Sequence, residues 1–268
     1  MQQRNLVYRM EEAQDLSWLL FKNNSNASYD FPSTLVYNEN MKSVGLLPAS
    51  GSASRLGGIP KFCLPMSENL TLLEWHVYSM LEVCDEVRIS TRLAWLEIVN
   101  NLKLPRNVSV MVIEPSTMSD AIIKMQTSEV AEYLVGMPDT MIRGTTENHY
   151  EKLKENSSDL TLALWECTKE LKGRVGQISI DQSGYAIGSA DKDPKCEFDK
   201  MWGAFLFINF VIDPKLSHPG LQFQDLIDAG IQISTQICDG EYVDLGKFSG
   251  LLDYYMHCEE KVARIPGR

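Results

Sequence analysis

The feature that most constrains this chain is the alternation, between residues 43 and 137, of short apolar runs with stretches of helical periodicity. Four runs have the length and composition of buried strands: residues 44–47, 86–91, 108–113 and 133–137. Between them, apolar residues recur every three or four positions in three stretches: residues 70–81, 93–102 and 119–131. Alternating strands and helices predict an α/β fold with a mostly parallel, Rossmann-like central sheet sandwiched by helices, and with ligands beyond the carboxyl ends of its strands.

The pattern changes near residue 160, where strand-like runs follow one another with few helical stretches between them. These runs are residues 160–166, 176–180, 185–189 and 204–210. They predict an antiparallel β insertion in the C-terminal half of the domain. The predicted elements that remain are a helix at 224–229, a strand at 232–238 and a closing helix at 248–262.

Residues 1–42 differ from the rest of the chain. A helix is predicted over residues 11–21, and it is followed by the Asn- and Ser-rich stretch NNSNASYDFPS. We therefore expect two parts, an N-terminal arm or cap at residues 1–42 and one α/β domain at residues 43–268.

Composition narrows the class of protein. With 268 residues, of which 44% are hydrophobic, the chain can bury one large core. A formal net charge of −11 argues against sequence-independent nucleic-acid binding, which depends on Lys and Arg. No apolar run reaches the ~18 residues of a spanning helix and the N-terminal stretch lacks the apolar core of a signal peptide, so we expect a cytoplasmic protein without a membrane partner. The six cysteines form no CxxC pair, which favours scattered thiols over a zinc site or disulfides.

A loop rich in small residues, LPASGSASRLGGIPKFCLP, follows the first predicted strand. Small side chains allow the backbone to approach a phosphate chain, and Arg55 and Lys61 can neutralise its charge. The loop is therefore a candidate triphosphate cradle, with an ordinary flexible connection as the alternative. It lacks the GxxxxGKS/T of a P-loop and the GxGxxG of a dinucleotide fold, which argues against kinases and dehydrogenases.

The loop resembles the opening signature of the sugar-phosphate nucleotidyltransferase family, which runs L-A-A-G-x-G-x-R-L and then P-K-x-L-x-P. Ala53 stands where that family commonly has its second glycine. The resemblance implies that Arg55 contacts the outer phosphates and that Lys61 assists phosphate binding. It also implies that the loop backbone holds the nucleotide through four residues: Pro48, Ala49, Ser50 and Gly51.

Two aspartates match metal-binding segments of the same family, in the family's order. The segment VGMPDTMI resembles the strand-end segment whose aspartate binds Mg²⁺, which assigns that role to Asp139. The segment EYVDLGKFSGLL resembles W-x-D-x-G-T-P-x-x-L-L, which makes Asp244 the second ligand, with Lys247 in place of the usual threonine. Mg²⁺ prefers one or two carboxylates together with phosphate oxygens and waters. For Asp139 the alternative is a turn cap after Pro138.

The segment DQSGYAIGSADKDPK is similar to the family's G-x-V strand and E-K-P turn, and Asp191 and Lys192 take the E-K positions. The resemblance implies that Asp191 contacts a sugar hydroxyl and that Lys192 binds the acceptor phosphate, with Lys195 as a substitute. A solvated charged turn is the alternative. In the following KMWGAFLFI, Gly203 would lie near the sugar, whereas the ring of Trp202 is expected in the core.

The weakest match is EPSTMSDAI, where the family often shows P-x-G-T-A-x-A and Thr117 stands at the glycine position. The resemblance implies that Ser119 and Asp120 contact the base and the ribose. Helix capping by Ser119 is the alternative.

Together these segments span residues 43 to 257, and the resemblance implies an Mg²⁺-dependent nucleotidyltransferase. Such an enzyme joins a nucleoside triphosphate to a sugar 1-phosphate and releases pyrophosphate. Two alternatives stay open, a cytidylyltransferase for a phosphorylated alcohol or amino alcohol and a non-catalytic domain that binds sugar nucleotides. A retaining glycosyltransferase of similar architecture is a weaker alternative. Such an enzyme normally carries a D-x-D metal motif, and the only matching string in this sequence, Asp191-Lys-Asp, precedes a proline in a charged turn. The sequence leaves the base, the sugar and homo-oligomer formation open.

Overall fold

The structure is a computed structural model, and it describes residues 41–53, 57–67, 69–155, 158–208, 210–245 and 250–251. The N-terminal arm and its predicted helix at 11–21 lie outside the described residues, apart from Met41 and Lys42. Of the closing helix predicted at 248–262, Gly250 and Leu251 are described, and both are helical.

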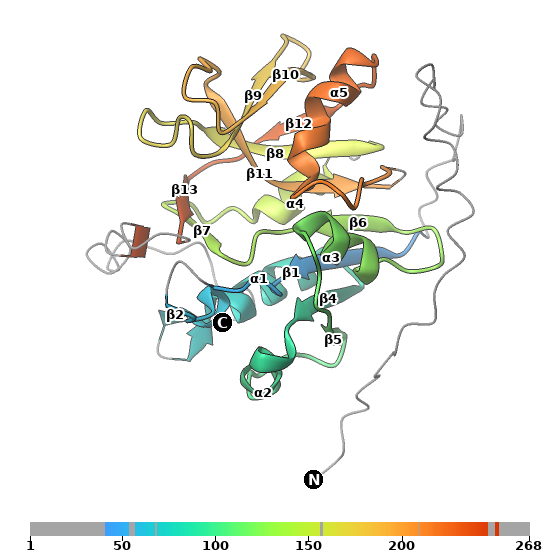
Figure 1. Ribbon diagram of the computed structural model, residues 1–268, viewed down its shortest axis with the longest axis vertical. Coiled ribbons are helices and arrows are strands. Elements are labelled where there is room, and N and C mark those ends of the chain that lie inside the picture. The colour runs from blue at the N-terminus through green and yellow to red at the C-terminus, as the bar shows by residue number, and fades with distance from the viewer. Residues whose placement is uncertain are drawn as a thin grey trace.

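A nine-stranded sheet forms the centre of the molecule, in the order β10-β9-β11-β6-β1-β4-β5, with β8 added to β11 and β12 added to β8 (Figure 1). Its strands are β1 (Ser43–Pro48), β4 (Glu86–Thr91), β5 (Val108–Val112), β6 (Glu132–Val135), β8 (Leu160–Glu166), β9 (Gly176–Ile180), β10 (Ala186–Asp191), β11 (Lys200–Phe207) and β12 (Ser234–Ile237). Strands β4, β8 and β9 have the bounds that the sequence predicts, and the other strands differ by a few residues at their ends.

The sheet has a parallel part and an antiparallel part. Strands β6, β1, β4 and β5 run parallel to one another. The antiparallel part joins at β11, which pairs with β6 through residues 205–207 and with β9 through Lys200 and Met201. In Figure 1, β1, β4 and β5 lie in the lower half of the view, and β8 to β12 lie in the upper half. This confirms the predicted Rossmann-like sheet with an antiparallel insertion in the C-terminal half.

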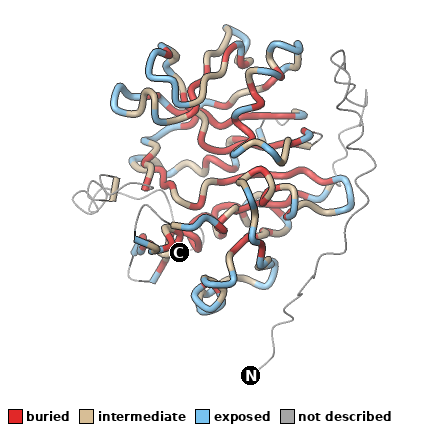
Figure 2. Tube along the Cα trace, in the orientation of Figure 1, coloured by how far each residue is buried: buried red, intermediate tan, exposed pale blue. Residues whose placement is uncertain are grey.

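Five described α-helices pack against the sheet: α1 (Leu72–Leu81), α2 (Leu96–Asn100), α3 (Met118–Met125), α4 (His149–Lys154) and α5 (Phe223–Asp228). Successive strand residues point to opposite faces. Leu47 and Leu206 therefore face a core formed with α1 and α4, whereas Leu46 and Phe205 face a core formed with α3 and α5. Figure 2 shows that the most buried segments follow the strands. No helix in the described part of the chain is both long and apolar enough to span a membrane.

Several short elements were not predicted from the sequence. Strand β7 (Thr140–Arg143) pairs antiparallel with β13 (Glu241–Asp244), and β2 (Pro65–Ser67) pairs with β3 (Leu70–Thr71). Three 3-10 helices accompany them: η3 (Lys61–Cys63), η4 (Leu93–Trp95) and η5 (Pro219–Gln222). Helix α4 has six residues and β7 has four, and segments of this length are too short to show a clear period.

Helix α3 ends earlier than the sequence predicts, at Met125 instead of residue 131. Nη1 of Arg88, on β4, donates hydrogen bonds to the carbonyls of Met125 and Gln126 at 3.0 and 3.3 Å. These carbonyls belong to the group that a helix end leaves without a backbone donor, so Arg88 stabilises the stop. Gln126 is already extended, and the chain turns toward β6. Periodicity could not show this, because the donor lies 37 positions away.

A buried ion pair lies at the amino ends of β1 and β6. Nζ of Lys154, on α4, lies 2.8 Å from Oε2 of Glu132, whose side chain is 4% exposed. The same ammonium donates to Oγ of Ser43 and to the carbonyl of Val83, both at 2.9 Å. Oε1 of Glu132 has no hydrogen-bond partner among the described residues. Because the carboxylate is buried, its charge depends on Lys154 for compensation.

Replacing Lys154 by Met should lower the free energy of unfolding by about 3 kcal/mol, because Glu132 then keeps a buried charge with the hydroxyl of Ser43 but without a counter-charge. The double variant Lys154→Met with Glu132→Leu should recover most of this loss, since no unpaired charge remains. Urea unfolding of both variants and the wild type at pH 7 measures the two differences. A single variant as stable as the wild type would show that Glu132 does not depend on this ammonium.

Candidate active site

The loop after β1 begins at the carboxyl edge of the parallel strands, where the sequence predicts a phosphate cradle. The N–H of Ala49 donates to the carbonyl of Ser90 at 3.1 Å, and the hydroxyls of Ser50 and Ser90 lie 3.1 Å apart. Nε of Arg92 donates to the carbonyl of Ser50 at 2.6 Å. Gly51 is exposed, with no atom within 4 Å of the position that a Cβ would take. The start of the loop is thus fixed on β4, and Gly51 presents an open backbone.

The same loop contains one backbone position of unusual geometry. Pro48 is the last residue of β1, and five positions later Ala53 has a φ of 53°, in the left-handed region that favours glycine. The carbonyl of Ala53 accepts a hydrogen bond from the N–H of Gly58 at 3.1 Å. Ala53 takes this conformation without being glycine, at a cost of about 1–2 kcal/mol. Arg55 lies outside the described residues.

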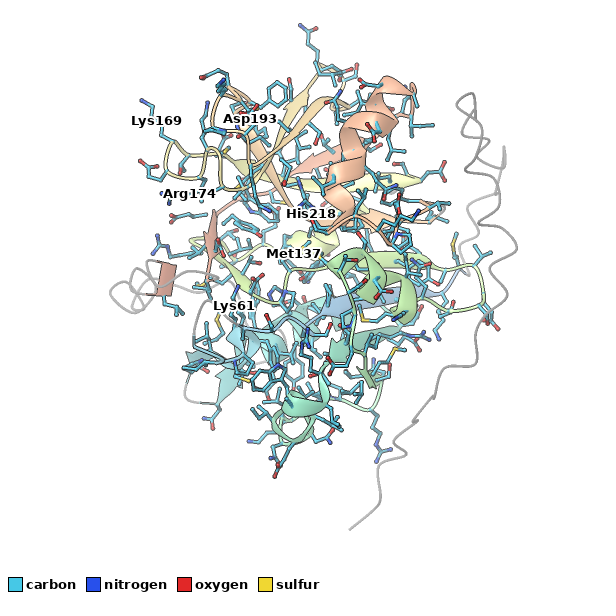
Figure 3. The ribbon with its side chains drawn as sticks, viewed as in Figure 1. Lys61, Met137, Lys169, Arg174, Asp193 and His218 are labelled. Carbon is cyan, nitrogen blue, oxygen red and sulfur yellow. The ribbon has the colours of Figure 1, made fainter. Side chains whose placement is uncertain are left out.

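Lys61 and Asp139 form an ion pair at this edge of the sheet. Lys61 begins η3, and its Nζ lies 2.8 Å from Oδ2 of Asp139, in the turn between β6 and β7. The side chain of Asp139 is 38% exposed and that of Lys61 is 16% exposed. Figure 3 labels Lys61 and Met137, two residues before Asp139, near the middle of the molecule. The structure therefore brings together two predicted site residues from distant segments, and solvent reaches their contact.

Strand pairing brings the second aspartate to the first. Asp244 is the partner of Thr140 in the β7–β13 ladder, and the N–H of Leu245 donates to the carbonyl of Asp139 at 3.0 Å. Burial, followed by the charges of Asp139 and Asp244, raises the pKa of Tyr242, which lies on β13. No group of three or more metal-ligating side chains occurs within the described ranges. A metal held by these two carboxylates would complete its shell with substrate oxygens and water.

The predicted acceptor residues gather at the end of β10. Oδ2 of Asp191 lies 3.3 Å from Nε2 of His218 and 3.6 Å from Nζ of Lys192, which itself has a φ of 51°. Nε2 of His218 lies against Asp191 without the geometry of a full hydrogen bond, and Nδ1 has no hydrogen-bond partner among the described residues. Burial opposes ionisation of Asp191, but the contacts and charges of His218 and Lys192 outweigh it and lower the pKa of this carboxyl.

Two residues of β11 have clear packing roles. A Cβ at Gly203 would lie 2.2 Å from the ring of Tyr242, so the glycine makes room for that ring. The indole of Trp202 passes between Gly176 and Gly220, whose Cβ atoms would lie 2.0 and 2.4 Å from it. The Trp202 ring is thus packed within the protein, as the sequence predicts. A contact between Gly203 and a sugar stays a prediction.

The start of α3 differs from the sequence interpretation. Thr117 caps the helix, because its Oγ1 accepts from the N–H of Asp120 at 3.0 Å, so the alternative of capping by Ser119 is wrong. The carboxylate of Asp120 accepts from the N–H of Ser116 at 2.9 Å and lies 3.4 Å from Nζ of Lys124. Ser119 is fully buried, and its hydroxyl has no hydrogen-bond partner among the described residues. Nucleotide contacts by Ser119 and Asp120 stay predictions.

A buried polar network supports the turn that carries Asp139. Nε2 of His76, on α1, lies 2.8 Å from the carbonyl of Thr140, and its Nδ1 lies 2.7 Å from the hydroxyl of Tyr150. Because a carbonyl can only accept, Nε2 carries the proton and Nδ1 accepts from Tyr150. Burial lowers the pKa of His76 to about 4, against the opposing effects of the Thr140 carbonyl and the Asp139 charge. Burial and the charge of His76 lower the pKa of the adjacent His149 to about 3.

Sequence reasoning did not single out four residues that the structure brings to the site: His76, Arg92, His218 and Tyr242. Arg92 directly follows a predicted strand, so the rule that ligands lie beyond strand ends could have found it. Tyr242 takes the position of the Trp in the family's W-x-D segment. An aromatic residue two positions before a proposed metal ligand was a signal that could have found it. The two histidines gave no signal, because their partners are remote; His76 and Thr140 are 64 positions apart.

Comparisons with known proteins bear on the fold. No protein-family model matches the sequence, and neither does any curated protein. A Bacillus anthracis protein described as a glucose-1-phosphate thymidylyltransferase, in complex with sucrose, matches with a TM-score of 0.65 and 15% identity over 82% of this chain and 96% of its own. The inositol-1-phosphate CTP transferase from T. maritima matches with a TM-score of 0.60 and 11% identity, over 84% of this chain and 99% of that one. The UDP-glucose pyrophosphorylase from Acinetobacter baumanii matches with a TM-score of 0.64 and 16% identity, over 81% of this chain and 93% of that one. These matches confirm the fold that the resemblance implies.

The two buried histidines should make stability depend on pH. Each binds a proton more readily in the unfolded chain, where its pKa is about 6.5, than in the folded protein. The stability that comes from keeping both histidines neutral is fully present above pH 6.5. As the pH falls from 6.5 toward 4, the free energy of unfolding decreases by about 1.4 kcal/mol per pH unit for each histidine. Urea unfolding of wild type and of His149→Phe at pH 7, 6 and 5 should give a shallower dependence for the variant. Equal slopes would show that His149 is protonated in the folded protein.

Proposed function

We propose that this protein is a nucleotidyltransferase that converts a nucleoside triphosphate and a sugar 1-phosphate to a nucleoside diphosphate sugar and pyrophosphate. The observation that carries the proposal is that strand pairing sets the Asp244 segment beside the Asp139 turn, where Lys61 forms an ion pair with Asp139. Pairing of β7 with β13 sets Asp244 opposite Thr140, the residue that follows Asp139. Nζ of Lys61 lies 2.8 Å from Oδ2 of Asp139. All three were assigned to this chemistry on sequence resemblance alone.

The position of this group in the sheet supports the proposal. Strands β1 and β6 are parallel neighbours, and the phosphate loop and the Asp139 turn both follow their carboxyl ends. Open α/β sheets bind their ligands beyond these ends. A triphosphate held by the loop backbone at Gly51 would lie at the same edge as the two carboxylates.

The donor set suits Mg²⁺. Asp139 and Asp244 offer hard oxygen ligands, and Mg²⁺ is usually held by one or two carboxylates together with phosphate oxygens. The ammonium of Lys61, 2.8 Å from Oδ2 of Asp139, supports a role for this carboxylate in binding cations. When bound, Mg²⁺ would neutralise charge on the α-phosphate as it develops.

The reaction we propose is an in-line displacement. An oxygen of the acceptor phosphate forms a bond to the α-phosphorus, and the bond from the α-phosphorus to the bridging oxygen breaks, so that pyrophosphate leaves with the electron pair. The residues position the reactants and balance charge, which is how proteins accelerate such transfers generally. Arg55 would stabilise the pyrophosphate, and Lys61 and Lys192 would bind the acceptor phosphate.

The acceptor end of the site is proposed at Asp191 and Lys192. Contacts with His218 and Lys192 favour the ionised form of Asp191, which suits a carboxylate that accepts a hydrogen bond from a sugar hydroxyl. Ser119, Asp120 and Gly203 complete the proposed contacts, with the base, the ribose and the sugar respectively.

A second candidate is a cytidylyltransferase that acts on a phosphorylated alcohol. Its specific support is the match to the inositol-1-phosphate CTP transferase, which covers 84% of this chain and 99% of that one. The same loop, aspartates and lysines would serve both reactions, so only the acceptor and the base separate them.

We expect pyrophosphate release with Mg²⁺ for one pair in a matrix of nucleoside triphosphates against glucose 1-phosphate, other sugar 1-phosphates, inositol 1-phosphate and phosphocholine. An active sugar 1-phosphate would support the first candidate, and activity with CTP and a polyol or amino-alcohol phosphate the second. Nucleotide binding by calorimetry, without turnover for any pair, would instead favour the non-catalytic domain.

The variants Asp139→Asn and Asp244→Asn should each lower kcat/KM at least about 100-fold, because each removes a charge that orients the metal and the phosphates. Asp181→Asn is a matched control, since Asp181 accepts from the N–H groups of Ser183 and Tyr185 in a turn and an amide oxygen can do the same. We expect wild-type activity for the control. Retention of activity by either active-site variant would remove that residue from the proposed metal site.

A further inference from the structure

We propose that His76 is a positioning residue that fixes the relative placement of Asp139 and Asp244, an inference that rests on the proposed function. The link between the three residues is Thr140. It follows Asp139 directly, and it is the ladder partner of Asp244. Nε2 of His76 donates to its carbonyl at 2.8 Å. His76 therefore holds a residue that joins the Asp139 turn to the Asp244 strand.

Thr140 is held on its other sides as well. Its N–H and its hydroxyl both donate to the carbonyl of Met137, at 3.2 and 2.9 Å. The side chain of Tyr242, two residues before Asp244, also interacts with the side chain of Thr140. The carbonyl of Thr140 is the group that these local contacts leave for His76.

Tyr150 fixes the imidazole in the required state. Its hydroxyl lies 2.7 Å from Nδ1 of His76, so it donates there and leaves the proton on Nε2. A Cβ at Gly136 would lie 2.1 Å from the same hydroxyl, so the glycine at the end of β6 makes room for it. The rings of Trp75 and His149 also pack against this pair.

Burial makes this network rigid. His76, Tyr150 and Thr140 are 1%, 0% and 6% exposed. Water cannot easily replace a lost donor at such a position. Without His76, the buried carbonyl of Thr140 would lack a hydrogen bond, and the turn would shift to relieve that cost. A neutral imidazole also provides the donor without adding a positive charge beside a proposed cation site.

The experiment measures Mn²⁺ binding by electron paramagnetic resonance on the full chain without nucleotide, and in parallel the Mg²⁺ concentration for half-maximal pyrophosphate release. The variants are Tyr150→Phe, His76→Leu and His76→Gln, whose amide can still donate. The matched control is Tyr133→Phe, because Tyr133 is also buried, at 4% exposed, and its hydroxyl forms hydrogen bonds with Thr127 instead of with the network behind the Asp139 turn.

Loss of a hydrogen bond behind a metal ligand typically weakens metal binding by about 10- to 100-fold. We expect Tyr150→Phe to weaken Mn²⁺ binding about 10-fold, His76→Leu more, and His76→Gln less than His76→Leu. The half-maximal Mg²⁺ concentration should rise in the same order, with kcat at saturating Mg²⁺ changed less. Tyr133→Phe should bind Mn²⁺ within about twofold of the wild type.

Wild-type Mn²⁺ affinity in folded Tyr150→Phe and His76→Leu proteins would overturn this inference and leave the proposed function standing. Equal weakening in Tyr133→Phe would also overturn it, because the effect would then be general loosening. If the wild type binds no Mn²⁺ without nucleotide, the half-maximal Mg²⁺ concentration for pyrophosphate release decides, because substrate oxygens then complete the metal's shell. An equal half-maximal concentration in the wild type and in Tyr150→Phe would overturn the inference. If His76→Leu does not fold, Tyr150→Phe decides the matter, because it deletes one hydroxyl.

Discussion

The pairing of β7 with β13 is the interaction on which the candidate site depends. A ladder of two four-residue strands is marginal on its own. Here it is supported from several sides: Arg143 and Glu241, 98 positions apart, form an ion pair at one end. At the other end the N–H of Leu245 donates to the carbonyl of Asp139. Next to Glu241, the ring of Tyr242 packs on Trp165 beside Gly203. The ladder thus ties the Asp244 segment to the Asp139 turn, and the core beneath keeps it in place.

The two edges of the parallel sheet each carry a carboxylate–ammonium pair, and the two pairs differ in how far they are buried. At the amino ends, the carboxylate of Glu132 is 4% exposed and its charge is compensated by Lys154 within the protein. At the carboxyl ends, the carboxylate of Asp139 is 38% exposed beside the ammonium of Lys61. A buried pair is costly to separate, whereas a partly exposed pair can exchange its partner for a phosphate or a cation at little cost. The Glu132–Lys154 pair therefore contributes to stability, whereas the Asp139–Lys61 pair can open to bind a ligand.

Gly203, which sequence resemblance places near a sugar, has a packing partner in the fold, and so do three other glycines. Gly203 accommodates Tyr242, Gly136 accommodates the hydroxyl of Tyr150, and Gly176 and Gly220 enclose the indole of Trp202. By contrast, Ala53 takes a glycine-like φ in the phosphate loop without being glycine. Small residues near this site thus serve the placement of large aromatic side chains, which in turn support the strands that carry the aspartates.

By itself, the sequence determined the alternation of strands and helices, the antiparallel insertion and the segments that carry Lys61, Asp139 and Asp244. It could do so because strand and helix periods are local, and because the segments of Lys61, Asp139 and Asp244 resemble motifs of a known family. Only the tertiary structure decided where α3 ends, which residue caps it, and that β7 pairs with β13. It alone also brought His76 to Thr140 and His218 to Asp191. Apart from the cap of α3, which is local, these contacts join residues remote in sequence and leave no periodic trace in the chain, so the packing of the whole domain selects them.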